Sequence, residues 1–127
     1  MIHLDTSALI DAVTGPRRSM PVLRQIIGDG LRIGVSTLVL YEWQRGPRTP
    51  EELALARALL PPDAVTAFGE VEARVAAEYY RKAARARGRE IDLAIAACAV
   101  TQEAELWTLN PADFADLKGL QLYPGRV

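Results

Sequence analysis

Four acidic side chains stand where the sequence predicts that a strand ends or a helix begins. Each lies among apolar or helix-capping residues, where a charge is costly unless something neutralises it. They are too far apart in the chain to pair within one helix, and carboxylates that the fold brings together repel one another and need a cation. Hard divalent ions such as magnesium take oxygen ligands of this kind. The leading hypothesis is therefore a metal-dependent phosphoryl-transfer site built from Asp5, Glu42, Asp92 and Asp113.

The elements that must position these acids alternate along the chain. Short apolar strands are predicted over 1–5, 31–35, 64–68, 105–109 and 120–123. Helices are predicted over 8–13, 20–28, 37–46, 50–60, 69–88 and 93–104, with a capped turn of helix over 110–117. Strands that alternate with helices indicate an α/β fold in which a short central parallel sheet is flanked by helices.

In sheets of this kind, functional sites form beyond the carboxyl ends of the strands. Asp5 ends the first predicted strand, and Asn110 and Asp113 follow the fourth. Glu42 and Asp92 lie in early turns of the helices placed after the second strand and before the fourth. We therefore expect all four acids at the same edge of the sheet.

The composition is that of a single folded domain covering residues 1–127, with 50% hydrophobic and 24% charged residues. A formal net charge of −1 gives no global basic field, although 15 basic residues leave room for local RNA contacts. One cysteine, Cys98, and one histidine, His3, exclude an internal disulfide and a structural zinc site. Neither a signal peptide nor a membrane span is predicted, so we expect a cytoplasmic location and no membrane.

Several short segments, taken in order, resemble the PIN-domain family, in particular the VapC-type toxins of bacterial toxin–antitoxin pairs. They cover nearly the whole chain, namely 2–10, 36–42, 91–97, 106–114 and 119–122. Any single segment is a weak signal, whereas the ordered set is specific. The resemblance implies a three-layer PIN-like domain and an endoribonuclease that depends on Mg²⁺, for which Mn²⁺ substitutes.

The resemblance also implies roles for individual residues. The family's four acidic positions fall on Asp5, Glu42, Asp92 and Asp113, and its supporting polar positions fall on Thr6 and Asn110. By this resemblance Asp5 and Asp92 are the expected direct metal ligands. Asp113 is expected to bind directly or through water, and Glu42 to hold a second metal or orient the water. The number of metal ions, one or two, stays open. By the same resemblance, hydrolysis is expected to leave a 5′-phosphate and a 3′-hydroxyl.

A run of basic residues stands at the end of the long predicted helix, just before the Asp92 segment. It consists of Arg81, Lys82, Arg85, Arg87 and Arg89. Guanidinium groups suit phosphate, so the run could steer an RNA backbone toward the acids. Cations near the end of a helix are also stabilising without any ligand, and both interpretations stay open.

Partners follow from the resemblance as well. A VapC-type toxin is normally neutralised by a VapB-type antitoxin that lays a segment across the groove, and such toxins usually form a homodimer. Contact with DNA is expected only indirectly, through the antitoxin. The sequence does not identify the RNA that is cleaved.

Other classes of function are less compatible with the sequence. A phosphatase with an aspartyl nucleophile would want a second Asp two positions after Asp5, where Ser7 stands. A phosphoacceptor receiver domain needs a lysine after a late strand, and Lys118 is poorly placed for that. The remaining alternative is a catalytically silent RNA- or protein-binding module on the same fold. Such a module would be expected to lack one or more of the acids, and none is missing.

Overall fold

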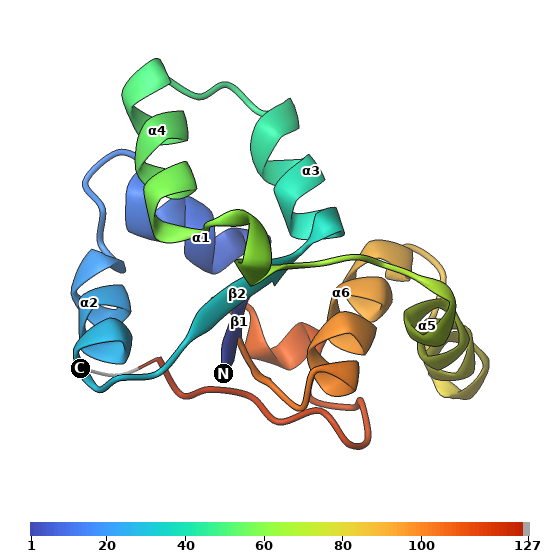
Figure 1. Ribbon diagram of the computed structural model, residues 1–127. Helices are drawn as coiled ribbons and strands as arrows, with labels where there is room; N and C mark the ends of the chain where they lie inside the picture. The colour runs from blue at the N-terminus through green and yellow to red at the C-terminus, as the bar shows by residue number, and fades with distance from the viewer. Residues whose placement is uncertain (126–127) are drawn as a thin grey trace.

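Strands and helices alternate along residues 1–125, which are the residues that the computed structural model describes (Figure 1). In chain order the elements are β1 (Ile2–Leu4), α1 (Thr6–Val13), α2 (Met20–Gly28), β2 (Ile33–Ser36), α3 (Thr37–Arg45), α4 (Pro50–Leu59), η1 (Pro62–Ala64), β3 (Val65–Thr66), α5 (Glu70–Lys82), α6 (Glu90–Thr101), β4 (Glu105–Trp107) and η2 (Pro111–Asp113). The elements labelled η are single turns of 3₁₀ helix.

The four strands form one parallel sheet in the order β3-β2-β1-β4. On one side of β1, Ile2 lies opposite Ile33 of β2; on the other side, Leu4 lies opposite Trp107 of β4. The chain therefore builds the sheet outward from β1 to β3 and then returns to the opposite side of β1. At such a reversal, the connections leave toward opposite faces and open a crevice beyond the strand ends.

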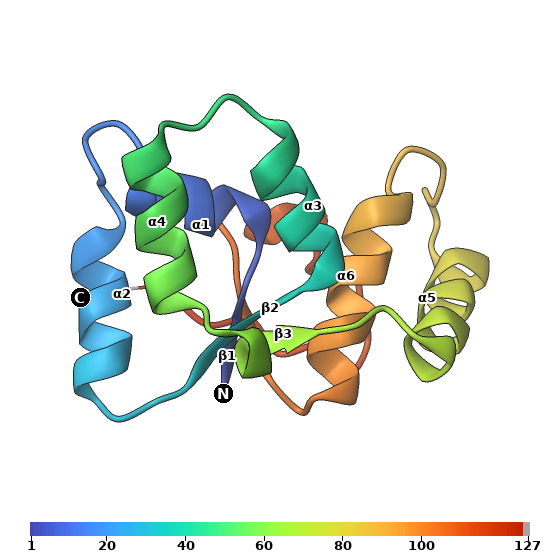
Figure 2. The same cartoon turned by 45° about the horizontal axis from the view of Figure 1, so that its top comes forward.

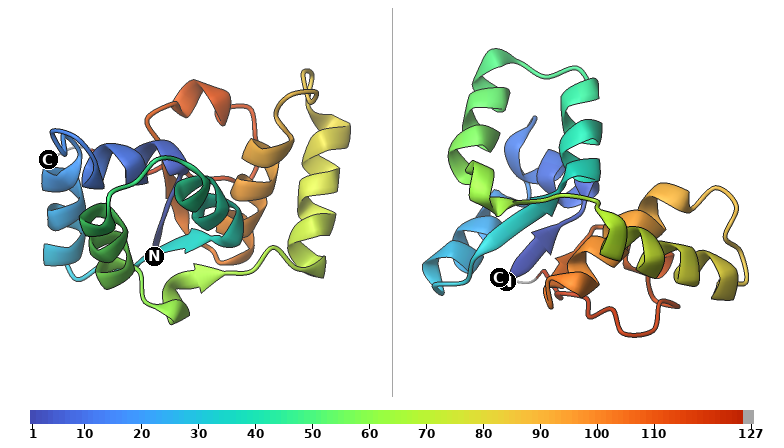
Figure 3. Two further views of the ribbon diagram at one scale, coloured as in Figure 1. Left: turned by 90° about the horizontal axis from the view of Figure 1, so that it is seen from above. Right: turned by 45° about the vertical axis from the view of Figure 1, so that its right-hand side comes forward.

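Helices cover both faces of this sheet. Figures 1 and 2 show α1, α2 and α4 gathered on one side, and α6 with α5 outside it on the other. Helix α3 contacts both α1 and α6, and the views in Figure 3 show it standing above the sheet between the two groups. The predicted three-layer α/β architecture is confirmed. Within residues 1–125, none of the helices combines the length and the apolar character that crossing a membrane requires.

Local sequence explains most of the element boundaries. The Ser36 hydroxyl accepts a hydrogen bond from the Val39 backbone N–H and so caps α3. Thr49 and Glu52 form a capping box at the start of α4, with reciprocal bonds of 2.9 and 3.1 Å. Helix α6 is buried continuously from Leu93 to Ala99, which makes it the central helix that its apolar sequence predicts.

Several predicted boundaries were wrong: the helix predicted over 93–104 spans 90–101, and the turn of helix predicted over 110–117 is confined to η2. Two further differences have an identifiable form. The long helix predicted over 69–88 ends at Lys82, and Ala83 is already extended. The following segment has no large apolar side chain, and Ala86 packs against the core from the loop instead. The predicted strand over 120–123 is reduced to one bridge, between Leu106 and Leu122.

Candidate active site

Asp5 follows β1 directly and is held from several directions. Its backbone N–H donates to the Trp107 carbonyl at 2.8 Å, which ties the carboxyl ends of β1 and β4 together. The residue is only 5% exposed. The hydroxyls of Ser7 and Thr108 both donate to the same carboxylate oxygen, Oδ2, at 3.0 and 2.7 Å. Because both hydroxyls use Oδ2, the other oxygen is left for a further ligand.

Ser7 and Thr108 were not among the predicted site residues. Ser7 Oγ also accepts from the Leu109 N–H, and Thr108 Oγ1 accepts from the Asn110 N–H, each at 3.0 Å. The two hydroxyls therefore orient Asp5 and shape the loop after β4 at the same time. The sequence feature that could have identified Thr108 as a site residue is its position directly after β4, at the edge of the sheet where Asp5 lies. Asn110 contributes this backbone bond, while its side chain is exposed and does not cap η2.

Glu42 lies in the second turn of α3, on the side of that helix that faces α1. The predicted supporting residue Thr6 donates its hydroxyl to Glu42 Oε1 at 2.5 Å. Arg45, one turn further along α3, lies 3.5 Å from Glu42 Oε2, and the Glu42 side chain is 20% exposed. A hydroxyl and a weak ion pair thus hold the carboxylate toward the N-terminus of α1, where Asp5 stands.

Asp92 lies in the first turn of α6, and the other predicted acids influence its pKa. Its pKa is raised from the ordinary value of 3.8 to about 6, first by burial and then by the negative charges of Asp5, Asp113 and Glu42. The positive charge of Arg89 lowers this pKa by a smaller amount. Asp5, Asp113 and Glu42, which come from three other parts of the chain, therefore lie near enough to Asp92 to raise its pKa.

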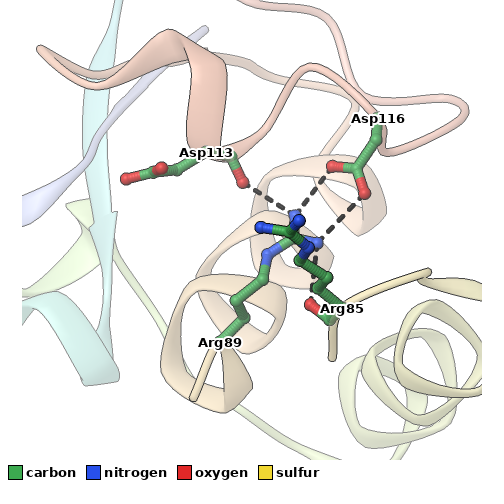
Figure 4. A network of polar contacts seen from close by, with 4 residues as sticks. All are labelled: Arg85, Arg89, Asp113 and Asp116. Atoms are coloured by element: carbon green, nitrogen blue, oxygen red, sulfur yellow. Dashed lines mark hydrogen bonds and ion pairs between the residues drawn. The ribbon is translucent and has the colours of Figure 1, made fainter. Parts of the chain in front are cut away.

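Asp113 ends η2, in the loop that follows β4, and its side chain is exposed. Figure 4 shows its carboxylate pointing away from Arg89, while its backbone carbonyl accepts a bond of 2.8 Å from that guanidinium. Arg89 also forms a two-pronged ion pair with Asp116, at 2.7 and 3.0 Å. Asp116, a further acid in the same loop, is therefore engaged in a structural pair.

The donor chemistry fits a hard divalent cation. Carboxylate oxygens are the ligands that Mg²⁺ and Mn²⁺ prefer, and a cation would relieve the repulsion that raises the pKa of Asp92. Among residues 1–125, however, no three or more His, Cys, Asp or Glu side chains are already spaced to hold an ion. Binding would therefore require side-chain movement, and the four-carboxylate metal site stays a prediction.

The predicted basic run divides into two parts. Arg81 and Lys82 close α5, and Arg85 and Arg87 lie exposed in the loop that leads to α6. Arg89 differs, because its side chain is 20% exposed and is committed to the contacts with the loop after β4. The first four are placed to meet a ligand from solvent, whereas Arg89 is part of the framework.

Comparison with known proteins gives consistent results. The family model for the PIN domain matches residues 2–120. Ribonuclease VapC19 of Mycobacterium tuberculosis is 31% identical over 121 residues, which cover 93% of this chain and 95% of that protein. The chain of VapBC2 from Rickettsia felis, solved bound to a DNA fragment from its promoter, matches with a TM-score of 0.75 at 23% identity, covering 97% and 98% of the two chains. FitAcB from Neisseria gonorrhoeae matches with a TM-score of 0.73 at 20% identity over 100% of both. At these identities the two structures show the shared fold.

Proposed function

The chain belongs to the PIN-domain family, and from this starting point we propose that it is a metal-dependent endoribonuclease acting as the toxin of a toxin–antitoxin pair. The name of its relative, Ribonuclease VapC19, supports RNA as the substrate class. The observation that carries the proposal is the arrangement of the acids: Asp5 follows β1, Asp113 lies in the loop after β4, and the charges of Asp5, Asp113 and Glu42 help to raise the pKa of Asp92. The repulsion between these acids and Asp92 opposes folding, and a bound cation would relieve it.

The proposed metal ligands have distinct environments. Asp5 is the rigid member, because it is buried and two hydroxyls fix one of its oxygens. Asp92 is the second direct ligand and starts α6, where the helix N-terminus adds a favourable field for its negative charge. Asp113 lies on an exposed loop, which suits binding directly or through water. Glu42, oriented by Thr6, is placed to hold a second ion or to orient the attacking water.

When bound, Mg²⁺ or Mn²⁺ would lower the pKa of a coordinated water and neutralise phosphoryl oxygens. The protein's own contribution is to orient Asp5 and Glu42 through the hydroxyls of Ser7, Thr108 and Thr6 before the substrate arrives. The exposed basic residues of the loop before α6 would meet the RNA phosphates, since that loop leads directly to the first turn that carries Asp92. Hydrolysis would leave a 5′-phosphate and a 3′-hydroxyl.

The proposed protein partner is a VapB-type antitoxin. Two of the solved neighbours, from Rickettsia felis and Neisseria gonorrhoeae, are described as VapBC2 and FitAcB, and the fold they share with this chain supports such a partner. An apolar depression between α3 and α4, lined by Leu40, Trp43, Leu53, Ala56 and Leu60, offers a surface for an antitoxin segment beside the helix that carries Glu42. We further propose a homodimer and a cytoplasmic location, with DNA contacted only through the antitoxin.

The test is cleavage of a mixed RNA pool by the purified protein while Mg²⁺ or Mn²⁺ is titrated. Wild type is compared with Asp92→Asn and with Asp63→Asn, which removes an exposed carboxylate from η1 at a distance from the site. Metal-dependent cleavage that Asp92→Asn loses and Asp63→Asn keeps is the expected result.

Calorimetric titration with Mn²⁺ accompanies the cleavage assay, because it separates the two ways in which cleavage can fail. Binding without cleavage means that the RNA pool lacks the preferred substrate, and sequencing a cellular RNA digest then becomes the assay. If wild type neither binds Mn²⁺ nor cleaves RNA, the proposal is wrong and the catalytically silent binding module takes its place.

A further inference from the structure

Arg89 occupies an unusual position, because it joins the two segments that deliver Asp92 and Asp113. It is the N-cap residue of α6 and stands three residues before Asp92. Its guanidinium reaches across to the loop after β4, where it meets Asp116 and the backbone of Asp113 (Figure 4). The side chain is 20% exposed, so most of it is removed from solvent.

The Arg89 guanidinium donates hydrogen bonds from both of its terminal nitrogens. Nη2 donates to Asp116 Oδ1 at 2.7 Å and Nη1 donates to Asp116 Oδ2 at 3.0 Å. Nη2 also donates to the Asp113 carbonyl at 2.8 Å, and Nη1 donates to the Arg85 carbonyl at 3.1 Å. Paired, planar bonds of this kind set a distance and an orientation, which a single point charge does not.

The backbone carbonyl and the side-chain carboxylate of Asp113 have different surroundings. Its carbonyl is bound to Arg89, whereas its carboxylate points away from the guanidinium, as Figure 4 shows. Arg89 therefore does not neutralise the Asp113 carboxylate by direct contact. It holds the backbone from which that carboxylate projects and leaves the carboxylate oxygens available.

Other anchors fix the rest of the same loop. Phe114 and Leu117 are buried in the core, and the Tyr79 hydroxyl donates to the Lys118 carbonyl at 2.8 Å. These contacts explain why the loop folds against α5 and α6. They lie after Asp113 in the chain, whereas the Arg89 contact is made to the backbone of Asp113 itself.

We propose that Arg89, fixed by Asp116, is a positioning residue that sets the Asp113 carboxylate relative to Asp92 for metal binding, and is not a contact for RNA. This inference rests on the proposed metal-dependent nuclease function. Arg89, one of the five predicted RNA-binding residues, is thereby assigned a structural role in the site instead. The remaining four basic residues keep their proposed place at the RNA surface.

The experiment measures Mn²⁺ affinity by calorimetry in the absence of RNA, together with kcat and KM for RNA cleavage. Arg89→Lys keeps the positive charge but cannot form the two-pronged pair. We expect it to weaken Mn²⁺ binding about tenfold, a typical loss when a group that supports a metal ligand is removed. The value of kcat at fixed metal concentration should fall, while KM stays near that of wild type.

A second variant, Asp116→Ala, tests the same ion pair by removing the partner of Arg89. It is expected to weaken Mn²⁺ binding by a similar factor. The double variant Arg89→Lys/Asp116→Ala should be no weaker than either single variant, because the pair acts as one unit. Circular dichroism at the assay temperature establishes that each variant is folded.

Two controls separate positioning from general loosening or loss of charge. Tyr79→Phe releases the far end of the same loop, and Arg74→Ala removes an exposed cation that pairs with Glu70 on α5. Both are expected to keep wild-type Mn²⁺ affinity. If Tyr79→Phe weakens binding as much as Arg89→Lys does, the loop as a whole is responsible and the inference is wrong.

Two further results would overturn the inference while the proposed function stands. One is wild-type Mn²⁺ affinity and kcat in Arg89→Lys, which would show that charge alone suffices. The other is a raised KM with unchanged Mn²⁺ affinity, which would identify Arg89 as an RNA contact. A wild-type protein that neither binds Mn²⁺ nor cleaves RNA would overturn the proposed function, and this inference with it.

Discussion

Replacing Asp92 by asparagine is expected to stabilise the metal-free protein. The ionised carboxyl is unfavourable in the folded state, because burial and then the neighbouring acids raise its pKa from 3.8 to about 6. When the folded-state pKa lies above the unfolded one, folding becomes less favourable as the pH rises from the lower value to the higher. Asparagine has a similar shape and no charge, so it removes this penalty.

The size of the effect follows from the same shift. The difference between 3.8 and about 6 corresponds to about 3 kcal/mol of unfavourable free energy at neutral pH. The Asp92 side chain keeps partial contact with solvent, and screening reduces this figure to about 1–2 kcal/mol. The favourable field at the N-terminus of α6, about 0.3–1 kcal/mol, acts in the opposite direction and is smaller. A net gain of about 1 kcal/mol is expected at pH 7.5.

The assay is urea unfolding of wild type and Asp92→Asn in a chelating buffer at pH 7.5 and at pH 4. The advantage of the variant should be present at pH 7.5, decline as the pH falls through about 6, and nearly vanish at pH 4. Comparing the two proteins at each pH cancels the titration of other groups. Glu90→Gln is the matched control, because Glu90 is an exposed acid in the same first turn of α6 and its replacement should give no gain.

Adding Mn²⁺ at pH 7.5 should reverse the order of stability. Wild type gains free energy from binding, and Asp92→Asn gains much less, since it lacks one ligand. The reasoning is refuted if the variant is less stable than wild type in the chelating buffer. It is equally refuted if the difference between the two proteins is the same at both pH values, because mutual repulsion among ionised carboxylates must depend on pH.

Three further predictions test the framework of the site and the sheet. Thr108→Val removes a hydroxyl that donates to the buried Asp5, so it should cost about 1–3 kcal/mol in urea unfolding and reduce RNA cleavage; unchanged cleavage would contradict the orienting role. His3 is buried, and burial followed by the charge of the chain's N-terminus lowers its pKa from 6.5 to about 4. His3 should therefore contribute a loss of about 3 kcal/mol as the pH falls from 6.5 to 4, so wild type should become less stable relative to His3→Gln by about that amount when unfolding is measured across that range. A Cβ at Gly34 would lie 2.8 Å from the Ala64 carbonyl oxygen, so Gly34→Ala should destabilise the protein by about 1–3 kcal/mol, and a thermal melt equal to that of wild type would show that β2 and η1 separate easily.

Much of the fold could be predicted because its signals are local. The capping box of Thr49 and Glu52, the Ser36 cap and the uniformly apolar α6 each specify an element from neighbouring residues, and the structure contains all three. The alternation of strands and helices then leaves a parallel sheet as the simplest arrangement. Asp5 directly after β1 and Asp113 after β4 also follow from local order, since both strand ends point to the same edge.

The remaining features depend on contacts between distant parts of the chain. Local propensity favours helix through the Ala- and Arg-rich residues after Lys82, yet the helix ends there, and Ala86 packs against the core from a loop. The hydroxyl pair that fixes Asp5 joins residues 7 and 108, and the Arg89 guanidinium joins α6 to residues 113 and 116.

The sequence by itself therefore determined the elements, their order and the types of side chain at the edge of the sheet. The tertiary structure decided which oxygen of Asp5 is occupied, which arginine belongs to the framework, and how strongly the acids act on one another. Hydrogen bonds and charge repulsion depend on distances between segments, and those distances exist only after the strands and helices have packed.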